Sequence, residues 1–252
     1  MRKVFDFNPK IYKNGDAHVF IATDYSRETA LAYQTTVYSI LSQTDKQVSI
    51  IPIQERNRWL ITKFCREKDL GGQAVYLKEG FVFKQSFDLL LEEANESKPL
   101  WFPPTLYKPN KSSFLSTDYH QELIVYNLEY GCLDRWFKAD PADIMRWSAN
   151  NYTRFNFVEA NLRPKTVREA KTMLAKYELR DLELGKLDLH WNIIPSIYEE
   201  IESYGKIKGF NFSHLKPWNN TKNRFAKEWW KEVNLFEING LRKDISFNIS
   251  AL

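Results

Sequence analysis

Short apolar runs bounded by turn residues recur along this chain and predict buried β-strands. The clearest of them cover residues 18–23, 48–53, 74–77 and 122–127. A continuous apolar run of this length is typical of a strand that is covered on both faces. These runs therefore predict a central sheet.

A helix-like segment lies between the first two runs. Asp24 or Ser26 can cap its start, because a side-chain oxygen there accepts from the free N–H groups of the first turn. Its apolar side chains recur at helical spacing, at Ala30, Tyr33, Val37 and Leu41. A strand–helix–strand unit of this kind predicts a parallel pair with a right-handed crossover.

The stretch from Gly71 to Glu93 is the centre of the predicted fold. The run 74–77 is followed by Lys78-Glu79-Gly80, by the β-prone residues 81–83 and by a helix-like segment at 86–93. In open α/β sheets, ligands bind just beyond the carboxyl ends of the strands. We therefore expect the chemistry, or the place where chemistry has been lost, at Lys78-Glu79-Gly80.

The rest of the chain gives weaker signals. Four prolines between Lys98 and Lys111 predict an extended loop rather than an element. Helices are predicted within 54–70, within 140–180 and around Trp229-Trp230, and a β-prone run covers 245–249. Two irregular aromatic stretches remain, Leu187–Pro195 and Gly209–Trp218.

The chain reads as one domain with an N-terminal extension at 1–16 and a tail at 236–252 that packs on it. We found no internal repeat, low-complexity segment or linker in its 252 residues. The alternation of strands and helices predicts an α/β fold, and one domain of this length is common in that class.

Composition and charge exclude several classes of protein. The 36 basic and 32 acidic residues leave a net charge of only +4, which argues against a non-specific nucleic-acid binder. Two cysteines form neither a disulfide framework nor a zinc pattern. With no secretory signal pattern and no apolar run long enough to span a membrane, we expect a soluble, cytoplasmic protein.

Residues 18–53 resemble the opening of GT-A glycosyltransferases of the glycogenin and galactosyltransferase-like group, a family 8-like group. Later pieces follow in the family's order, and the resemblance spans roughly residues 18–235. These pieces are Trp59–Phe64, Ala74–Leu77, Glu122–Asn127, Asp181–Gly185 with His190–Asn192, and Lys216–Trp218. The resemblance implies a mixed, mostly parallel central sheet flanked by helices.

The resemblance also implies a nucleotide-sugar donor, most simply a UDP-sugar, and a divalent Mn or Mg ion. In the family, an Asp-X-Asp motif after the central strand binds that ion, which suits hard oxygen ligands. Here the motif is degenerate, because Lys78-Glu79-Gly80 occupies its positions. The remaining candidate ligands are Glu79 and Asn211, since the family's closing histidine falls near Phe210 or Asn211.

Two functions follow from this departure. In the first, the Lys78 ammonium replaces the metal and faces the charge that develops on the diphosphate. The chain is then an enzyme that moves a sugar from its donor to a glycan or hydroxyl acceptor, with retention of configuration. In the second, the chain is a catalytically inactive GT-A-like module that serves as a binding or partner protein. Release of sugar from a nucleotide donor separates the two, and the oligomeric state stays open.

The resemblance assigns donor contacts to five more residues. Asp24 and Tyr25 fall where the family contacts the base and ribose, Lys63 replaces a donor-facing arginine, and Lys216 with Trp218 resembles the pair that closes on the diphosphate. The first three residues also have purely structural explanations. Asp24 can be a helix cap, Tyr25 a surface ring and Lys63 a solvated lysine.

The resemblance places Asp181 and Glu183 as the catalytic carboxylates that face the sugar. It places Asn127 and His190 near the acceptor. An exposed helix face explains the carboxylates equally well, a strand-end cap explains Asn127, and a packed ring explains His190.

Overall fold

The computed structural model describes residues 11–55, 60–104, 122–129, 185–195, 206–214, 216–218 and 225–238. Several sequence predictions lie outside these ranges. They concern Arg56, Arg58, Trp59, the helices at 140–180, the carboxylates Asp181 and Glu183, and the run at 245–249.

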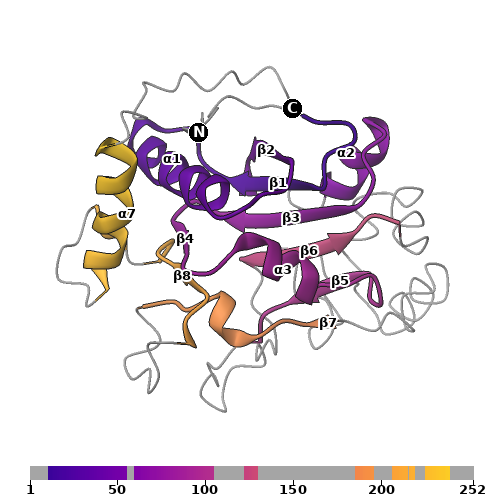
Figure 1. Cartoon of the computed structure of the whole chain (residues 1–252). Coiled ribbons are helices and arrows are strands. Elements are labelled where there is room, and N and C mark those ends of the chain that lie inside the picture. The colour runs from indigo at the N-terminus through magenta and orange to yellow at the C-terminus, as the bar shows by residue number, and fades with distance from the viewer. Residues whose placement is uncertain are drawn as a thin grey trace, which may run out of the picture.

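In the described part of the chain, six strands form one sheet (Figure 1). Its order is β2 (Val48–Ile53), β1 (Ala17–Ala22), β3 (Gln73–Lys78), β6 (Leu123–Asn127), β5 (Leu100–Phe102) and β7 (Gly185–Lys186). β1 pairs in parallel with both β2 and β3, whereas β6 runs antiparallel to both of its neighbours. The predicted mixed, mostly parallel sheet is therefore confirmed, and so is the parallel β1–β2 pair.

The sheet is covered by helices because its strands are apolar on both faces. All six residues of β1 are buried, and so are the four apolar residues of β3. Helix α1 (Arg27–Ser42) begins at the predicted cap, where Ser26 Oγ accepts from the Thr29 N–H at 3.2 Å. Its Tyr33, Val37 and Ile40 share one core with the strands and with α3 (Phe87–Glu93).

A separate two-stranded ribbon lies beside this sheet. It pairs β4 (Phe81–Phe83) with β8 (Gly209–Asn211), antiparallel, with Val82 opposite Phe210. The interpretation of 209–218 as wholly irregular was therefore wrong at β8. Residue 209 must be glycine, because a Cβ there would lie 2.7 Å from the Trp191 carbonyl oxygen.

Helix α7 (Ala226–Ile238) packs beside α1, at the left of Figure 1. Trp229 is completely buried, and Trp230 is partly buried at the rim of the same core. This confirms the predicted late helix. Helix α2 (Ile61–Glu67) likewise confirms a helix within 54–70.

The prediction of a loop from Lys98 to Lys111 was wrong at Leu100–Phe102, which form β5. The prolines flank this strand and do not interrupt it, so each of its N–H groups remains able to pair. Leu100 and Phe102 are buried, and Trp101 pairs with Val125 of β6. In the described ranges, no helix is both long and apolar enough to cross a membrane.

Candidate functional site

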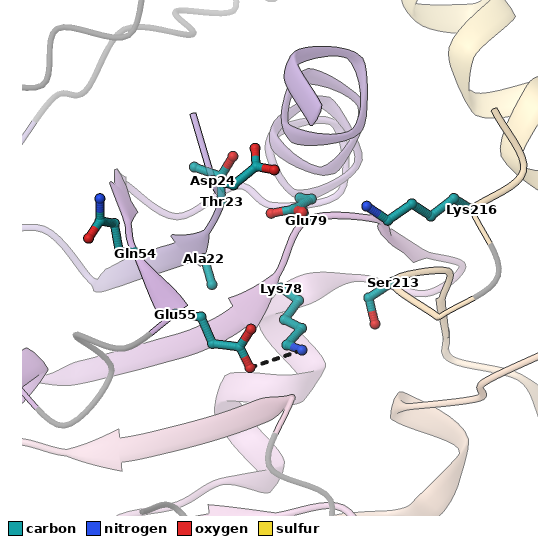
Figure 2. A pocket seen from close by; sticks show the side chains of 9 residues that line it. All are labelled: Ala22, Thr23, Asp24, Gln54, Glu55, Lys78, Glu79, Ser213 and Lys216. Atoms are coloured by element: carbon teal, nitrogen blue, oxygen red, sulfur yellow. Dashed lines mark ion pairs between the residues drawn. The ribbon is translucent and has the colours of Figure 1, made fainter. Parts of the chain in front are cut away.

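A pocket of about 650 Å³ opens at the carboxyl ends of β1, β2 and β3 (Figure 2). The three strands end level with one another, since Ala22 is opposite both Ile53 and Lys78. The residues just beyond the strands therefore gather at one edge. The pocket is lined by Ala22, Thr23, Asp24, Gln54, Glu55, Lys78, Glu79, Ser213 and Lys216.

Asp24 is held by the turn that joins β1 to α1. Its Oδ1 accepts from the Ser26 N–H at 2.8 Å and from the Thr29 hydroxyl at 2.5 Å. Tyr25 makes this turn possible by adopting a left-handed backbone, with φ of 59°. Burial favours a raised pKa for Asp24, but these hydrogen bonds outweigh it and lower the pKa, so the carboxylate is ionised.

Lys78 ends β3 and lies between two carboxylates. Its Nζ is 3.0 Å from Glu55 Oε1 and 3.1 Å from Glu122 Oε1. Burial favours a lower pKa, but the two carboxylates, Glu122 first, raise the pKa of Lys78 above its ordinary value. The side chain is therefore a fixed cation at the edge of the sheet.

Glu122 is a functional candidate that the sequence reasoning missed. Its side chain is only 9% exposed, yet it also accepts from Asn211 Nδ2 at 2.6 Å and lies 2.9 Å from His214 Nε2. Because β6 runs antiparallel to β3, the residue before β6 reaches the edge where β3 ends. The one sequence signal was a charged residue at the head of an apolar strand.

Glu79 follows Lys78 and faces Asp24 and Lys216, whose side chain reaches toward it in Figure 2. Its N–H donates to the Ala22 carbonyl at 3.0 Å, which fixes the backbone between β1 and β3. Burial, and then the charge of Asp24, raise the pKa of Glu79 to about 7, with Lys216 and Lys78 opposing the shift. Glu79 can therefore take up or release a proton near neutral pH.

The described residues do not fit a divalent metal ion. Lys78, where the sequence analysis expects the first metal ligand, is an ammonium that is paired with Glu55 and Glu122. Asn211 is buried, its Nδ2 donates to Glu122 and Asn192, and its Oδ1 accepts from the Ser213 N–H at 3.0 Å. Within these ranges no three His, Cys, Asp or Glu side chains are grouped to hold a metal.

Three predicted donor contacts lie beside the pocket or away from it. The Tyr25 hydroxyl donates to the Pro52 carbonyl at 3.1 Å. The Trp218 ring packs against Trp229 with centroids 4.8 Å apart, and the Lys216 ammonium lies 5.9 Å from its centroid. Lys63 is 54% exposed on α2 and pairs with Glu67, so the structure does not bring it to the pocket.

The two predicted acceptor residues are also away from the pocket. Asn127 lies opposite Gln73, at the far end of β3 from Lys78, and is 3% exposed. Its Nδ2 donates to the carbonyls of Asn95 and Lys98. His190 Nδ1 lies 2.7 Å from Asp188 Oδ1, in the short 3-10 helix Leu189–Trp191.

Comparison with known proteins gives a clear answer for the fold. No protein-family model and no curated protein sequence matches this chain. Solved structures do match it. The WbbM bifunctional glycosyltransferase, in its apo form, superposes with a TM-score of 0.58 at 12% identity, over 93% of this chain and 53% of that protein.

The apo form of the glycosyltransferase GlyE of Streptococcus pneumoniae TIGR4 superposes with a TM-score of 0.50 at 14% identity. The match covers 90% of this chain and 64% of GlyE. The chain thus spans about half of WbbM and less than two thirds of GlyE. At 12–14% identity these superpositions establish the fold alone, and the conclusion is that this chain has a GT-A-like glycosyltransferase fold.

Proposed function

We propose that the chain transfers a sugar from a nucleotide-sugar donor, a UDP-sugar, to a hydroxyl of a glycan or similar acceptor, with retention. The observation that carries this proposal is the pocket at the carboxyl ends of β1–β3 in a glycosyltransferase fold. Ligands of open α/β sheets bind at such an edge. Its volume of about 650 Å³ suits a ligand of nucleotide size.

In this proposal the protein itself supplies the positive charge. Lys78 is held as a cation at the strand end, and Lys216 lines the opposite side of the same pocket. Preorganised charges stabilise a leaving diphosphate without having to reorganise during the reaction. Asp24 and Tyr25 then contact the ribose and base, and Trp218 supports Lys216. The carboxylates Asp181 and Glu183 remain the proposed groups that face the sugar.

A second candidate, an inactive GT-A-like binding module, is favoured by the charges around the pocket. The Lys78 ammonium is already paired with two carboxylates. Among the described side chains around the pocket, acids outnumber bases: Asp24, Glu55, Glu79 and Glu122 against Lys78 and Lys216. A pocket with this balance is poor at attracting a free anion.

The deciding experiment is calorimetric titration with UDP, GDP, their common sugar conjugates and CMP-sugars, each with and without Mn²⁺. The enzyme proposal expects metal-independent binding that weakens at least about tenfold in Lys78→Met, because a charged hydrogen bond is lost. Lys68→Met removes an exposed lysine beyond α2 and serves as the matched control.

Release of free sugar from the bound donor is the second readout. Binding without any transfer or hydrolysis supports the inactive module. Absence of binding to every nucleotide rules out the enzyme. Binding only with Mn²⁺ shows instead that a metal, and not Lys78, meets the diphosphate.

A further inference from the structure

The two carboxylates that hold Lys78 differ in how firmly each is fixed. Glu122 is 9% exposed and, besides Lys78, meets Asn211, His214 and Ser213. Glu55 follows β2, lines the pocket and is 55% exposed. One partner of the ammonium is therefore built into the protein, whereas the other lies at the mouth of the pocket.

This difference decides which carboxylate can leave. The Glu55 side chain is 55% exposed, so water can replace the ammonium beside its carboxylate at little cost when the pair opens. A buried carboxylate that loses its partner stays desolvated and uncompensated, which is strongly unfavourable. Glu55 can therefore turn into solvent, whereas Glu122 keeps Lys78 in place.

We infer that Glu55 occupies an anion site on the Lys78 ammonium, and that a phosphate group of the ligand displaces it there. Glu122 remains as the permanent counter-ion and is a positioning residue for Lys78. That the phosphate belongs to a nucleotide diphosphate rests on the function proposed above. The exchange itself requires only a phosphate that enters the pocket.

Displacement of Glu55 by a phosphate also removes the problem that carboxylates outnumber ammonium groups around the pocket. A phosphate that simply joined the six charged side chains would meet an excess of carboxylates. When Glu55 leaves, one anion replaces another and the ammonium stays paired. Figure 2 shows this arrangement, with Glu55 bound to Lys78 on one side of the pocket and Lys216 directed inward from the other. Glu55 thus competes with the ligand for Lys78.

The test compares pyrophosphate and UDP as calorimetric probes of the full chain, in wild type, Glu55→Gln and Glu122→Gln. Glu55→Gln is expected to bind both probes about three- to tenfold more tightly, because a weak competing ion pair is gone. Glu122→Gln is expected to bind more weakly, since Lys78 loses its anchor. Glu96→Gln removes an exposed carboxylate that does not line the pocket and controls for net charge.

The outcomes distinguish failure of the exchange at Lys78 from failure of the proposed function. If UDP binds and Glu55→Gln leaves its affinity unchanged or weaker, the exchange is overturned and the proposed function stands. If pyrophosphate alone binds, and does so more tightly in Glu55→Gln, the exchange stands and the nucleotide function is overturned. If neither probe binds to any variant, both are overturned. Circular dichroism and thermal melting of Glu122→Gln separate loss of binding from loss of fold.

Discussion

At the scale of single residues, Glu79 is the pocket group whose charge changes near neutral pH. Its pKa is raised to about 7, first by burial and then by Asp24. The side chain is therefore largely uncharged below pH 7 and negative above it. A negative Glu79 repels a phosphate-bearing ligand in the same pocket.

We therefore predict that a nucleotide sugar binds about three- to tenfold more tightly at pH 6 than at pH 8, a change that corresponds to about 1 kcal/mol. A nucleotide sugar is the right probe, because its doubly esterified diphosphate does not titrate in this range. Calorimetry at pH 6, 7 and 8 measures the profile. Glu79→Gln should flatten it, and an unchanged profile in this variant would assign the effect to another group.

The residues of the pocket were only partly predictable from the sequence. Asp24, Lys78 and Glu79 were found because they follow apolar runs, and Lys216 because it belongs to the piece Lys216–Trp218. The structure brings all four to the pocket. Glu55 and Glu122 were missed. Their positions at the pocket depend on which strands are neighbours in the sheet and on whether those neighbours run parallel or antiparallel. A local pattern of apolar residues specifies neither the neighbours nor their direction.

At the scale of elements, Gly80 fixes the turn between β3 and β4. Its φ is +100°, and a Cβ there would lie 3.2 Å from the backbone nitrogen of Ser213. Side chains other than glycine are strained in such a backbone. The turn thereby sets the distance between Lys78 and the segment that carries Ser213 and Lys216.

Gly80→Ala is predicted to destabilise the protein by about 1–2 kcal/mol, from the strained backbone and the tight contact. Urea unfolding followed by circular dichroism measures this loss. Gly71→Ala is the matched control, because its Cβ would meet only the carboxylate end of the exposed Glu129 side chain. Equal losses in the two variants would contradict the special role of the turn.

Elements with long apolar runs were predicted to within one or two residues, as β1, β2 and β3 show. The three-residue strands β5 and β8 were not. Each is too short to show a period and lies among prolines or aromatic residues. β8 forms only because β4, far away in the sequence, offers it a partner.

At the scale of the whole molecule, an ion pair connects α7 to the β4–β8 ribbon. Lys84, just after β4, pairs with Glu228 of α7 at 2.8 Å. One turn further along, Glu232 is 8% exposed. Burial is the main cause that raises the pKa of Glu232 to about 7, opposed by Lys84 and Lys231.

A carboxyl group whose pKa is raised on folding binds more protons in the folded state, so its contribution to stability falls as pH rises from about 4.5 to 7. Glu232→Gln should therefore be more stable than wild type by about 2 kcal/mol at pH 8 and nearly equal to it at pH 5. Thermal melting at both pH values measures this. An equal difference at pH 5 and pH 8 would indicate a packing effect instead.

The fold class was predictable from the sequence because it depends on the order of many weak signals. Identity to WbbM and GlyE is only 12% and 14%, yet the fold is shared over 93% and 90% of this chain. The proposed chemistry depends instead on a few side chains around one edge of the sheet, and the order of strands and helices does not specify those side chains.

The β4–β8 pairing also has a consequence for how the protein is made. β4 leaves the ribosome well before its partner strand, and its Phe81, Val82 and Phe83 are all completely buried in the folded protein. Their partner strand at 209–211 and the covering Trp229 are synthesised much later. Until residues 209–211 are synthesised, the nascent chain therefore carries an apolar strand without its partner strand. One wall of the pocket, formed by Ser213 and Lys216, can be completed only after the segment from Gly209 to Trp229 has been synthesised.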